Sequence, residues 1–248
     1  MPNIRLTIEF DGTNYAGWQI QPKQKTIQGL LEASLKKIFG QDITVYGCGR
    51  TDAGVSARNY VANCHCPDRL SPARIAAALN FYLPSDIFVK SAEVVSDDFH
   101  ARYSAITKTY TYSIICNRSP LRSRFAWEVF PPLDIKRLEK GAKLFLGKKD
   151  FNPFCAIRSG NGICTIRSIH ITKKGDEILI KITGDRFLYK MVRRIVGALV
   201  AYATGRITVN DIRAALAGKK GKPFTSAPAQ GLILERVEYP KTGKGWRR

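Results

Sequence analysis

The sequence predicts an α+β protein built from two similar ferredoxin-like (RRM-like) halves, each with an antiparallel sheet. Two observations lead to this fold class. Residues 4–95 show strand and helix patterns in the order β-α-β-β-α-β, which is typical of the split βαβ arrangement. A comparable series of patterns follows residue 105. We therefore expect one domain at residues 1–105, a second at 106–240, a ligand-binding cleft between them, and a basic flexible tail at 241–248.

The first half begins with a half-buried strand, because residues 4–10 alternate apolar and polar side chains. A polar loop follows, in which Tyr15 and Trp18 are expected to be exposed. Thr26 can cap a helix whose apolar residues recur at helical spacing, and Gly40 can close it. The remaining elements are expected to be strands at residues 43–46, 59–66 and 87–95, and a helix that opens at Pro72 and runs to residue 79.

The second half is expected to contain a strand pair across a tight turn and one long helix. Its strands are predicted at residues 107–116, 165–172, 177–184 and 232–239, and its helices at residues 134–146 and 187–204. No repeat of fixed period is present, which excludes solenoid architectures.

The charge balance points to a polyanionic partner. The 248 residues include 40 Lys and Arg against 20 Asp and Glu, a formal charge of +20, which favours RNA or DNA first and an anionic membrane second. No stretch reaches the roughly 20 apolar residues that span a bilayer, and the N-terminus lacks the pattern of a signal peptide. We expect a cytoplasmic protein.

Cysteine spacing gives no indication of a disulfide scaffold or a metal site. None of the six cysteines forms a C-x-x-C pair. In Cys64-His65-Cys66, strand alternation would place both sulfurs on one face and the histidine on the other, which is poor geometry for chelation. We expect these cysteines to be small side chains of a half-buried strand, and no bound metal.

The loop at residues 47–55 is the densest candidate for chemistry. It contains three glycines around Arg50, Thr51 and Asp52, and glycine lets a ligand approach the backbone closely. An aspartate on such a loop could act as a nucleophile, a general base or a metal ligand. The residue pattern alone favours a simple turn, in which Asp52 bonds to its own backbone.

Two further stretches combine aromatic and basic residues. On the strand at residues 107–116, Tyr110 and Tyr112 lie on one face, an arrangement that can stack RNA bases, although core packing is the better interpretation for Tyr112. On the helix at residues 187–204, Arg193 and Arg194 point about 100° apart, so one can face a cleft while the other meets solvent or phosphate. A solvated helix edge is the alternative.

These stretches, taken in order, resemble the TruA family of tRNA pseudouridine synthases. The resemblance covers nearly the whole chain. The matching motifs lie at residues 10–19, 26–28, 49–55, 98–102, 108–112, 187–197 and 227–232.

The resemblance implies an isomerase that converts uridine to pseudouridine at positions 38 to 40 of the tRNA anticodon arm, with no cofactor. It implies a homodimer whose basic surfaces hold the tRNA. By position in the motifs, Asp52 is the catalytic aspartate, Tyr110 the active-site aromatic residue and Arg193 the basic partner of the aspartate. The cleft between the halves would then be catalytic. Residues expected to bind the substrate are Arg50, which would help to expel the target base, Arg102, Lys108, Tyr110 and Arg194.

One departure and two rival functions accompany this interpretation. The family usually has a histidine where this chain has Ser56, and we expect altered loop contacts there rather than lost catalysis. The chain could instead be a pseudouridine synthase with a different RNA target, or a basic RNA-binding protein without activity. The resemblance leaves two roles open for Asp52: attack on C1′ of the ribose, or removal of the 2′ proton to give a glycal.

Overall fold

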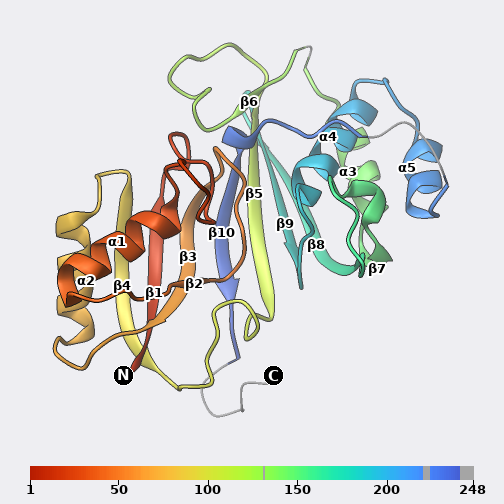
Figure 1. Ribbon diagram of the computed structural model, residues 1–248. Helices are drawn as coiled ribbons and strands as arrows, with labels where there is room; N and C mark the ends of the chain where they lie inside the picture. The colour runs from red at the N-terminus through yellow and green to blue at the C-terminus, as the bar shows by residue number, and fades with distance from the viewer. Residues whose placement is uncertain (131, 220–223, 241–248) are drawn as a thin grey trace. The chain divides into compact units, whose positions relative to one another are not determined.

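A computed structural model describes residues 1–130, 132–219 and 224–240 (Figure 1). The chain forms two compact units: the first comprises Met1–Ile106 and the chain from Leu234 onward, and the second comprises Thr107–Ile233. The closing strand, expected in the second domain, thus lies in the first unit. The basic tail expected at residues 241–248 lies outside the described residues.

The first unit is a mostly antiparallel sheet with helices α1 and α2 on one face (Figure 1). Its strands follow the order β4-β1-β3-β10, and β2 pairs with β3. β1 is antiparallel to both β3 and β4. Its elements are β1 (Asn3–Phe10), α1 (Ile27–Phe39), β2 (Tyr46–Gly47), β3 (Ser56–His65), α2 (Pro72–Tyr82), β4 (Ile87–Val95) and β10 (Leu232–Glu238).

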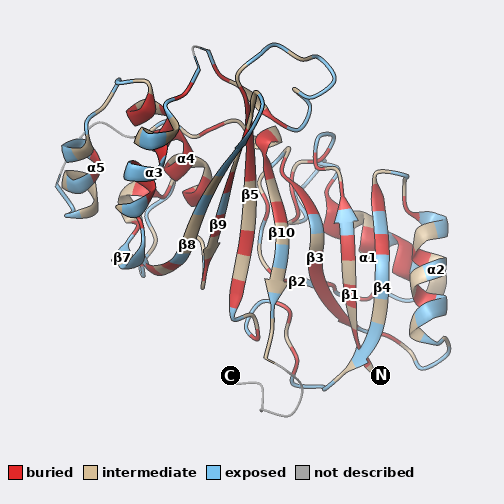
Figure 2. Cartoon of the chain, turned by 180° about the vertical axis from the view of Figure 1, so that it is seen from behind, coloured by how far each residue is buried: buried red, intermediate tan, exposed pale blue. Residues whose placement is uncertain are grey.

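The helix signals read from the sequence are confirmed in this unit. The Thr26 hydroxyl accepts a hydrogen bond from the backbone N–H of Gly29, and Gly40 ends α1 in the left-handed conformation at φ 73°. Ile27, Leu31 and Leu35 of this helix are buried. Figure 2 shows the same pattern across the unit, with buried residues along the strands and on one side of α1.

The prediction of a strand at residues 43–46 is wrong. Two polar side chains of α1 bind the backbone of Val45 instead: Glu32 accepts from its N–H at 3.0 Å, and the Gln28 amide donates to its carbonyl at 3.1 Å. Since these groups are satisfied by the helix, they do not pair with a neighbouring strand. Only Tyr46 and Gly47 pair with β3.

The second unit is a sheet in the order β5-β9-β8-β7, with β6 beside β5 and helices α3 and α4 over one face (Figures 1 and 2). All its pairs are antiparallel except β5 with β6. Its elements are β5 (Thr107–Ile115), β6 (Trp127–Glu128), α3 (Ile135–Lys143), β7 (Gly147–Asp150), η1 (Asn152–Phe154), β8 (Ile163–Lys174), β9 (Glu177–Gly184), α4 (Met191–Ala203), α5 (Val209–Leu216) and η2 (Ala229–Gly231). The expected mixture of helices with mostly antiparallel sheet is confirmed.

The long helix of this unit begins four residues later than expected. Lys190 adopts φ 58°, in the left-handed region, which a right-handed helix cannot contain. The helix therefore starts at Met191, and Phe187 precedes it. Helix α5 was not predicted; Thr208 and Asp211 begin it with a capping box.

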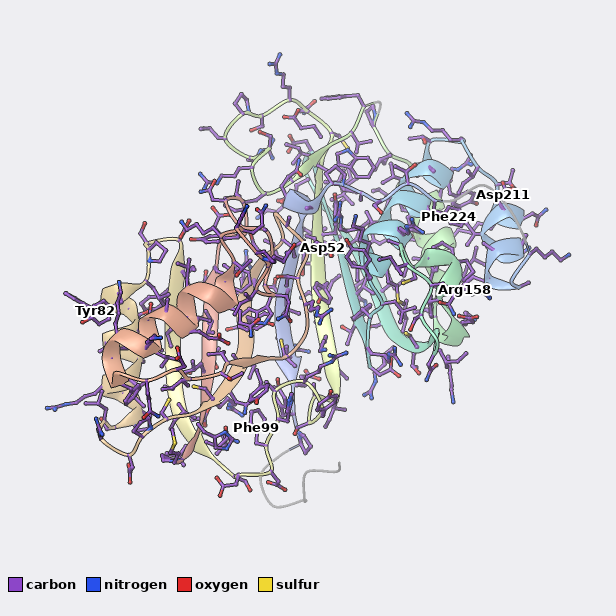
Figure 3. The ribbon with its side chains drawn as sticks, in the orientation of Figure 1. Asp52, Tyr82, Phe99, Arg158, Asp211 and Phe224 are labelled. Carbon is purple, nitrogen blue, oxygen red and sulfur yellow. The ribbon has the colours of Figure 1, made fainter. Side chains whose placement is uncertain are left out.

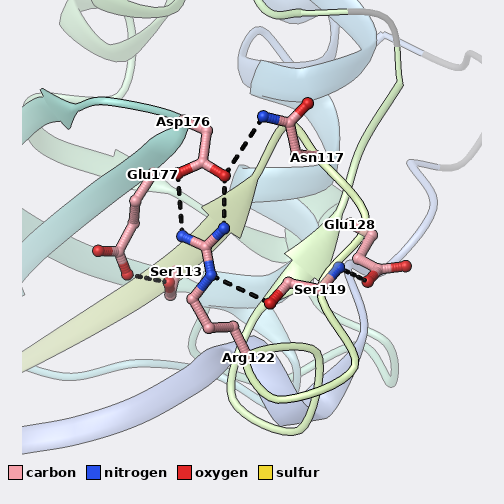
Figure 4. A network of polar contacts seen from close by, with 7 residues as sticks. All are labelled: Ser113, Asn117, Ser119, Arg122, Glu128, Asp176 and Glu177. Carbon is pink, nitrogen blue, oxygen red and sulfur yellow. Dashed lines mark hydrogen bonds and ion pairs between the residues drawn. The ribbon is translucent and has the colours of Figure 1, made fainter.

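A polar network holds the loop between β5 and α3 (Figure 4). The Arg122 guanidinium binds both carboxylate oxygens of Asp176 in the β8–β9 turn, one of them at 2.9 Å. Arg122 also donates to the Ser119 hydroxyl at 3.2 Å, and the Ser119 N–H donates to Glu128 at 2.9 Å. The hydrogen bonds from Arg122 lower the pKa of Asp176 to about 2. Because the pair is solvent-accessible, its role is to order the loop rather than to add much stability.

Candidate active site

Asp52 lies on the loop that follows β2, labelled in Figure 3. Exposure differs from residue to residue along this loop: Arg50 and Ala53 are exposed, Thr51 is buried, and Asp52 is half-buried. The carboxylate is therefore placed at the border between the protein interior and solvent, where a group that acts on a bound substrate is needed.

The segment after β1 holds this loop in place. The Trp18 N–H donates to the Thr51 carbonyl at 3.2 Å, and the Gly54 N–H donates to the Tyr15 carbonyl at 3.3 Å. Tyr15 and Trp18 were expected to be exposed, but only 3% and 2% of their surfaces are accessible. They are buried because they form the support of the Asp52 loop.

Two glycines of this segment allow the close approach. A Cβ atom at Gly12 would lie 2.1 Å from the Val55 carbonyl oxygen. At Gly17, which has φ 93°, it would lie 2.3 Å from the Thr51 carbonyl oxygen. No side chain fits at either position, so the motif at residues 10–19 serves to seat the Asp52 loop.

Ser56 completes this support. Its hydroxyl is buried and accepts a hydrogen bond from the Gly12 N–H at 3.0 Å. Ser56, which stands where the family usually has a histidine, is therefore hydrogen-bonded within the scaffold of the Asp52 loop.

Tyr110 and Tyr112 lie on one face of β5, as alternation predicts. The Tyr110 ring is half-buried and meets the Phe187 ring edge-on, with centroids 5.2 Å apart. Tyr112 is fully buried, and its hydroxyl donates to the Pro228 carbonyl at 2.8 Å. Burial raises the pKa of Tyr112 well above its usual range. Core packing is thus confirmed for Tyr112, while Tyr110 keeps an accessible surface.

Arg193 and Arg194 lie in the first turn of α4, and each binds a backbone carbonyl. Arg193 Nε donates to the Ala227 carbonyl at 2.7 Å, while the Ala227 N–H donates to the Arg193 carbonyl at 3.0 Å. The positive charge of Arg193 also acts on Tyr112. Arg194 donates to the Cys155 carbonyl at 2.6 Å. Both side chains are therefore oriented by the second unit itself.

The other candidate substrate-binding residues are divided between the units. Arg102 is exposed on the first unit. Lys108 is half-buried on β5, opposite Gly184 of β9. Asp52 and Arg50 belong to the first unit, and Tyr110 and Arg193 to the second. That these residues come together around one cleft stays a prediction.

Metal-binding groups do not gather in the described part of the chain: no three His, Cys, Asp or Glu residues there could share an ion. Cys64 Sγ and Cys66 Sγ lie 3.5 Å apart in the interior, while His65 is exposed, in agreement with the expected alternation. No helix among these residues is long and apolar enough to cross a membrane.

Sequence reasoning missed two contributors to this site. Phe187 fixes the Tyr110 ring, and the Ala227 carbonyl orients Arg193. Phe187 and Ala227 lie inside motifs that the sequence had singled out, but their roles depend on contacts between distant segments.

The family model described as tRNA pseudouridine synthase matches residues 6–104 and 142–240, which is most of the chain. The chain belongs to the tRNA pseudouridine synthase family. Both matched segments carry the motifs discussed above: Asp52 and its supporting loop lie in the first, and Arg193 with Ala227 in the second.

Relatives within the family match this synthase over 93–100% of their length. tRNA pseudouridine synthase A 2 of Clostridium perfringens is 40% identical, over 96% of this chain and 100% of that protein. tRNA pseudouridine synthase A of Maridesulfovibrio salexigens is 40% identical, over 99% of this chain and 93% of that protein. tRNA pseudouridine synthase A of Rhodopseudomonas palustris is 42% identical, over 96% of this chain and 100% of that protein. Among solved structures, the archaeal box H/ACA sRNP Nop10-Cbf5 complex aligns with 80% of this chain and 43% of that chain, with a TM-score of 0.37 at 10% identity.

Proposed function

We propose that this protein isomerises uridine to pseudouridine in tRNA, at positions 38 to 40 of the anticodon stem-loop. The observation that carries this proposal is the match, at about 40% identity over almost the whole chain, to proteins named tRNA pseudouridine synthase A. The charge of +20 agrees with a tRNA substrate. We expect a cytoplasmic homodimer with two ferredoxin-like halves in each subunit.

Asp52 is the proposed catalytic residue. A uridine within a stem must first leave the stack, at a cost of a few kcal/mol. The N1–C1′ bond then breaks, the detached uracil turns, and its C5 bonds to C1′; the C5 proton goes to water and N1 gains a proton. Asp52 would act on the sugar, either by attack on C1′ or by removal of the 2′ proton. Its half-buried place on a rigid loop supports either role.

Three other residues would assist. Arg193 would stabilise the negative charge that develops on the detached uracil or on Asp52, since its guanidinium is held in a fixed direction by Ala227. Tyr110 would stack on the uracil. The exposed Arg50, two residues before Asp52, would help to displace the target base and contact phosphate.

Release of tritium from tRNA labelled at uridine C5 tests the activity, because C5 loses its hydrogen when it bonds to C1′. We expect release with the unaltered protein and almost none with Asp52→Asn. No release with the unaltered protein would indicate the rival RNA-binding role, and undiminished release with Asp52→Asn would reject Asp52 as catalytic.

The target positions need a separate measurement. We expect a strain lacking this protein to have uridine in place of pseudouridine at positions 38 to 40 of its tRNAs. Intact pseudouridine at these positions, together with loss elsewhere, would favour the rival enzyme with a different RNA target.

A further inference from the structure

Three polar aromatic rings form a row on the surface of the first unit. The His100 ring lies in the middle, with its centroid 5.2 Å from that of Tyr46 and 4.5 Å from that of Tyr103. Tyr46 is 44% exposed and Tyr103 is 68% exposed. The Arg102 guanidinium lies 5.6 Å from the centroid of the Tyr103 ring. Large exposed rings that contact each other in this way call for an explanation, since their burial on folding is incomplete.

The backbone beneath this row is rigidly held. Asn63 Oδ1 accepts from the Ala101 N–H at 2.9 Å, and the Tyr239 hydroxyl donates to the Ala101 carbonyl at 2.7 Å. The Asn3 amide donates to the carbonyl of the buried Phe99, labelled in Figure 3, at 2.9 Å. Two strands, β1 and β3, together with Tyr239 thus fix residues 99–101, so the backbone that carries the central His100 ring is ordered before any partner binds.

The central ring is held in a neutral form. His100 Nδ1 accepts a hydrogen bond from the Arg102 N–H at 3.1 Å. Burial, together with the charge of Arg102, lowers the pKa of His100 below its usual value, so the ring is uncharged at pH 7. The His100 ring is tilted by 46° to the Tyr46 ring and by 44° to the Tyr103 ring. Aromatic rings of tyrosine and histidine are among those on which RNA bases stack.

We propose that Tyr46, His100 and Tyr103 form a stacking platform for an unpaired base of the RNA substrate, with Arg102 contacting its phosphate. This inference rests on the proposed function, which supplies an RNA with unpaired loop bases. Aromatic side chains beside arginine are the usual means of binding unpaired bases. The excess of 20 positive charges favours RNA over a protein partner for an aromatic surface of this kind.

The platform lies within reach of the RNA that Asp52 would act on. Tyr46 precedes Asp52 by six residues, so their Cα atoms are at most about 22 Å apart. One folded RNA spans such a distance easily. A base on the platform can therefore belong to the same RNA molecule as the uridine that reacts.

Binding of a fluorescent tRNA transcript tests the platform. We expect Tyr103→Ala to weaken binding about tenfold, and Tyr103→Phe to restore most of it, because the ring face is retained. Phe81→Ala is the matched control: Phe81 is 81% exposed and contacts the Tyr82 ring on α2, away from the platform. Equal binding by Tyr103→Ala and Phe81→Ala would overturn the proposal.

Salt dependence separates stacking from charge. Arg102→Ala should reduce the slope of log affinity against log salt by about 1, whereas Tyr103→Ala should leave the slope unchanged. As a second probe, a single-stranded hexa-adenylate should bind Tyr103→Ala more weakly than it binds the unaltered protein. A short RNA duplex should bind both proteins equally. Equal losses for both RNAs would contradict base stacking.

The remaining outcomes separate this inference from the proposed function and from dimer formation. Normal tritium release by the unaltered protein, with unchanged tRNA binding by Tyr103→Ala, would reject the platform alone. Absence of both tritium release and tRNA binding in the unaltered protein would reject the proposed function as well. A smaller mass for Tyr103→Ala in analytical ultracentrifugation would make the row a contact between two copies of this chain, and would also overturn the proposal.

Discussion

The loop that carries Asp52 and the helix start that carries Arg193 differ in the groups that hold them. Backbone groups, glycines and Ser56 support the loop. At α4 the arginine side chain itself binds the Ala227 carbonyl. Substitution of Arg193 therefore removes part of its own scaffold, whereas the backbone hydrogen bonds of the loop do not depend on the residue type at position 52.

Asp52→Asn should have the largest effect on activity. We expect tritium release to fall about 10³-fold, because the amide can neither attack nor accept a proton. The melting temperature separates this loss from unfolding: a shift of less than about 2 °C corresponds to less than about 1 kcal/mol, so the lost release would then lie in the chemistry. A fall in release that only follows a lower melting temperature would instead assign the carboxylate to the scaffold.

Gly12→Ala should affect activity and stability together. The new Cβ would need the space of the Val55 carbonyl oxygen, so the Asp52 loop must shift. We expect a loss of about 1–3 kcal/mol in urea unfolding, with a marked fall in tritium release. Gly160→Ala is the control, because a Cβ there meets nothing within 4 Å. Similar results for the two variants would refute the scaffold role of Gly12.

Arg193→Lys and Arg50→Ala compare an arginine that is part of its own scaffold with an arginine that is exposed. Both should lower turnover, by about 10²-fold for Arg193→Lys, while tRNA affinity changes by less than about threefold. Only Arg193→Lys should also lower stability, by about 1–2 kcal/mol, because lysine keeps the charge but loses the bond from Nε to Ala227. Equal losses of turnover and affinity would assign either arginine to general phosphate binding.

The smallest effects are expected from two threonines whose hydroxyl oxygens are buried. Among the described residues, the hydroxyls of Thr51, beside Asp52, and Thr111, on β5, find no hydrogen-bond partner. Thr51→Val and Thr111→Val remove an unsatisfied group and keep the shape, so each should raise the free energy of unfolding by up to about 1 kcal/mol. If Thr51→Val instead lowers turnover while Thr111→Val does not, the Thr51 hydroxyl takes part in the reaction.

Much of the fold could be predicted from local patterns. Strand alternation and cap residues located α1, α2, β4 and β9 well, because each signal lies within the element itself. The strand at residues 43–46 failed because two side chains of α1 bind the Val45 backbone, which no local pattern reveals. The prediction that α4 begins at residue 187 was wrong, because Lys190 takes a left-handed conformation that its residue type does not favour.

The site was predictable to a similar degree. The glycine-rich loop and the paired arginines are visible in the sequence, but their roles came from the resemblance to a family. The burial of Tyr15 and Trp18 was not foreseen, because their polar neighbours indicated an exposed loop. Their function as support depends on a contact with residues more than 30 positions later in the chain.

The position of β10 has a consequence for synthesis on the ribosome. This strand completes the sheet of the first unit beside β3, yet it is made only after the whole of Thr107–Ile233. At roughly 5–20 residues per second, the nascent first unit must wait about 6 to 25 s for its last strand. During that interval one side of β3 lacks its final partner, and a chain truncated before Leu234 would never gain it. The first unit is therefore separate in structure, but it cannot complete its folding before the second unit has been synthesised.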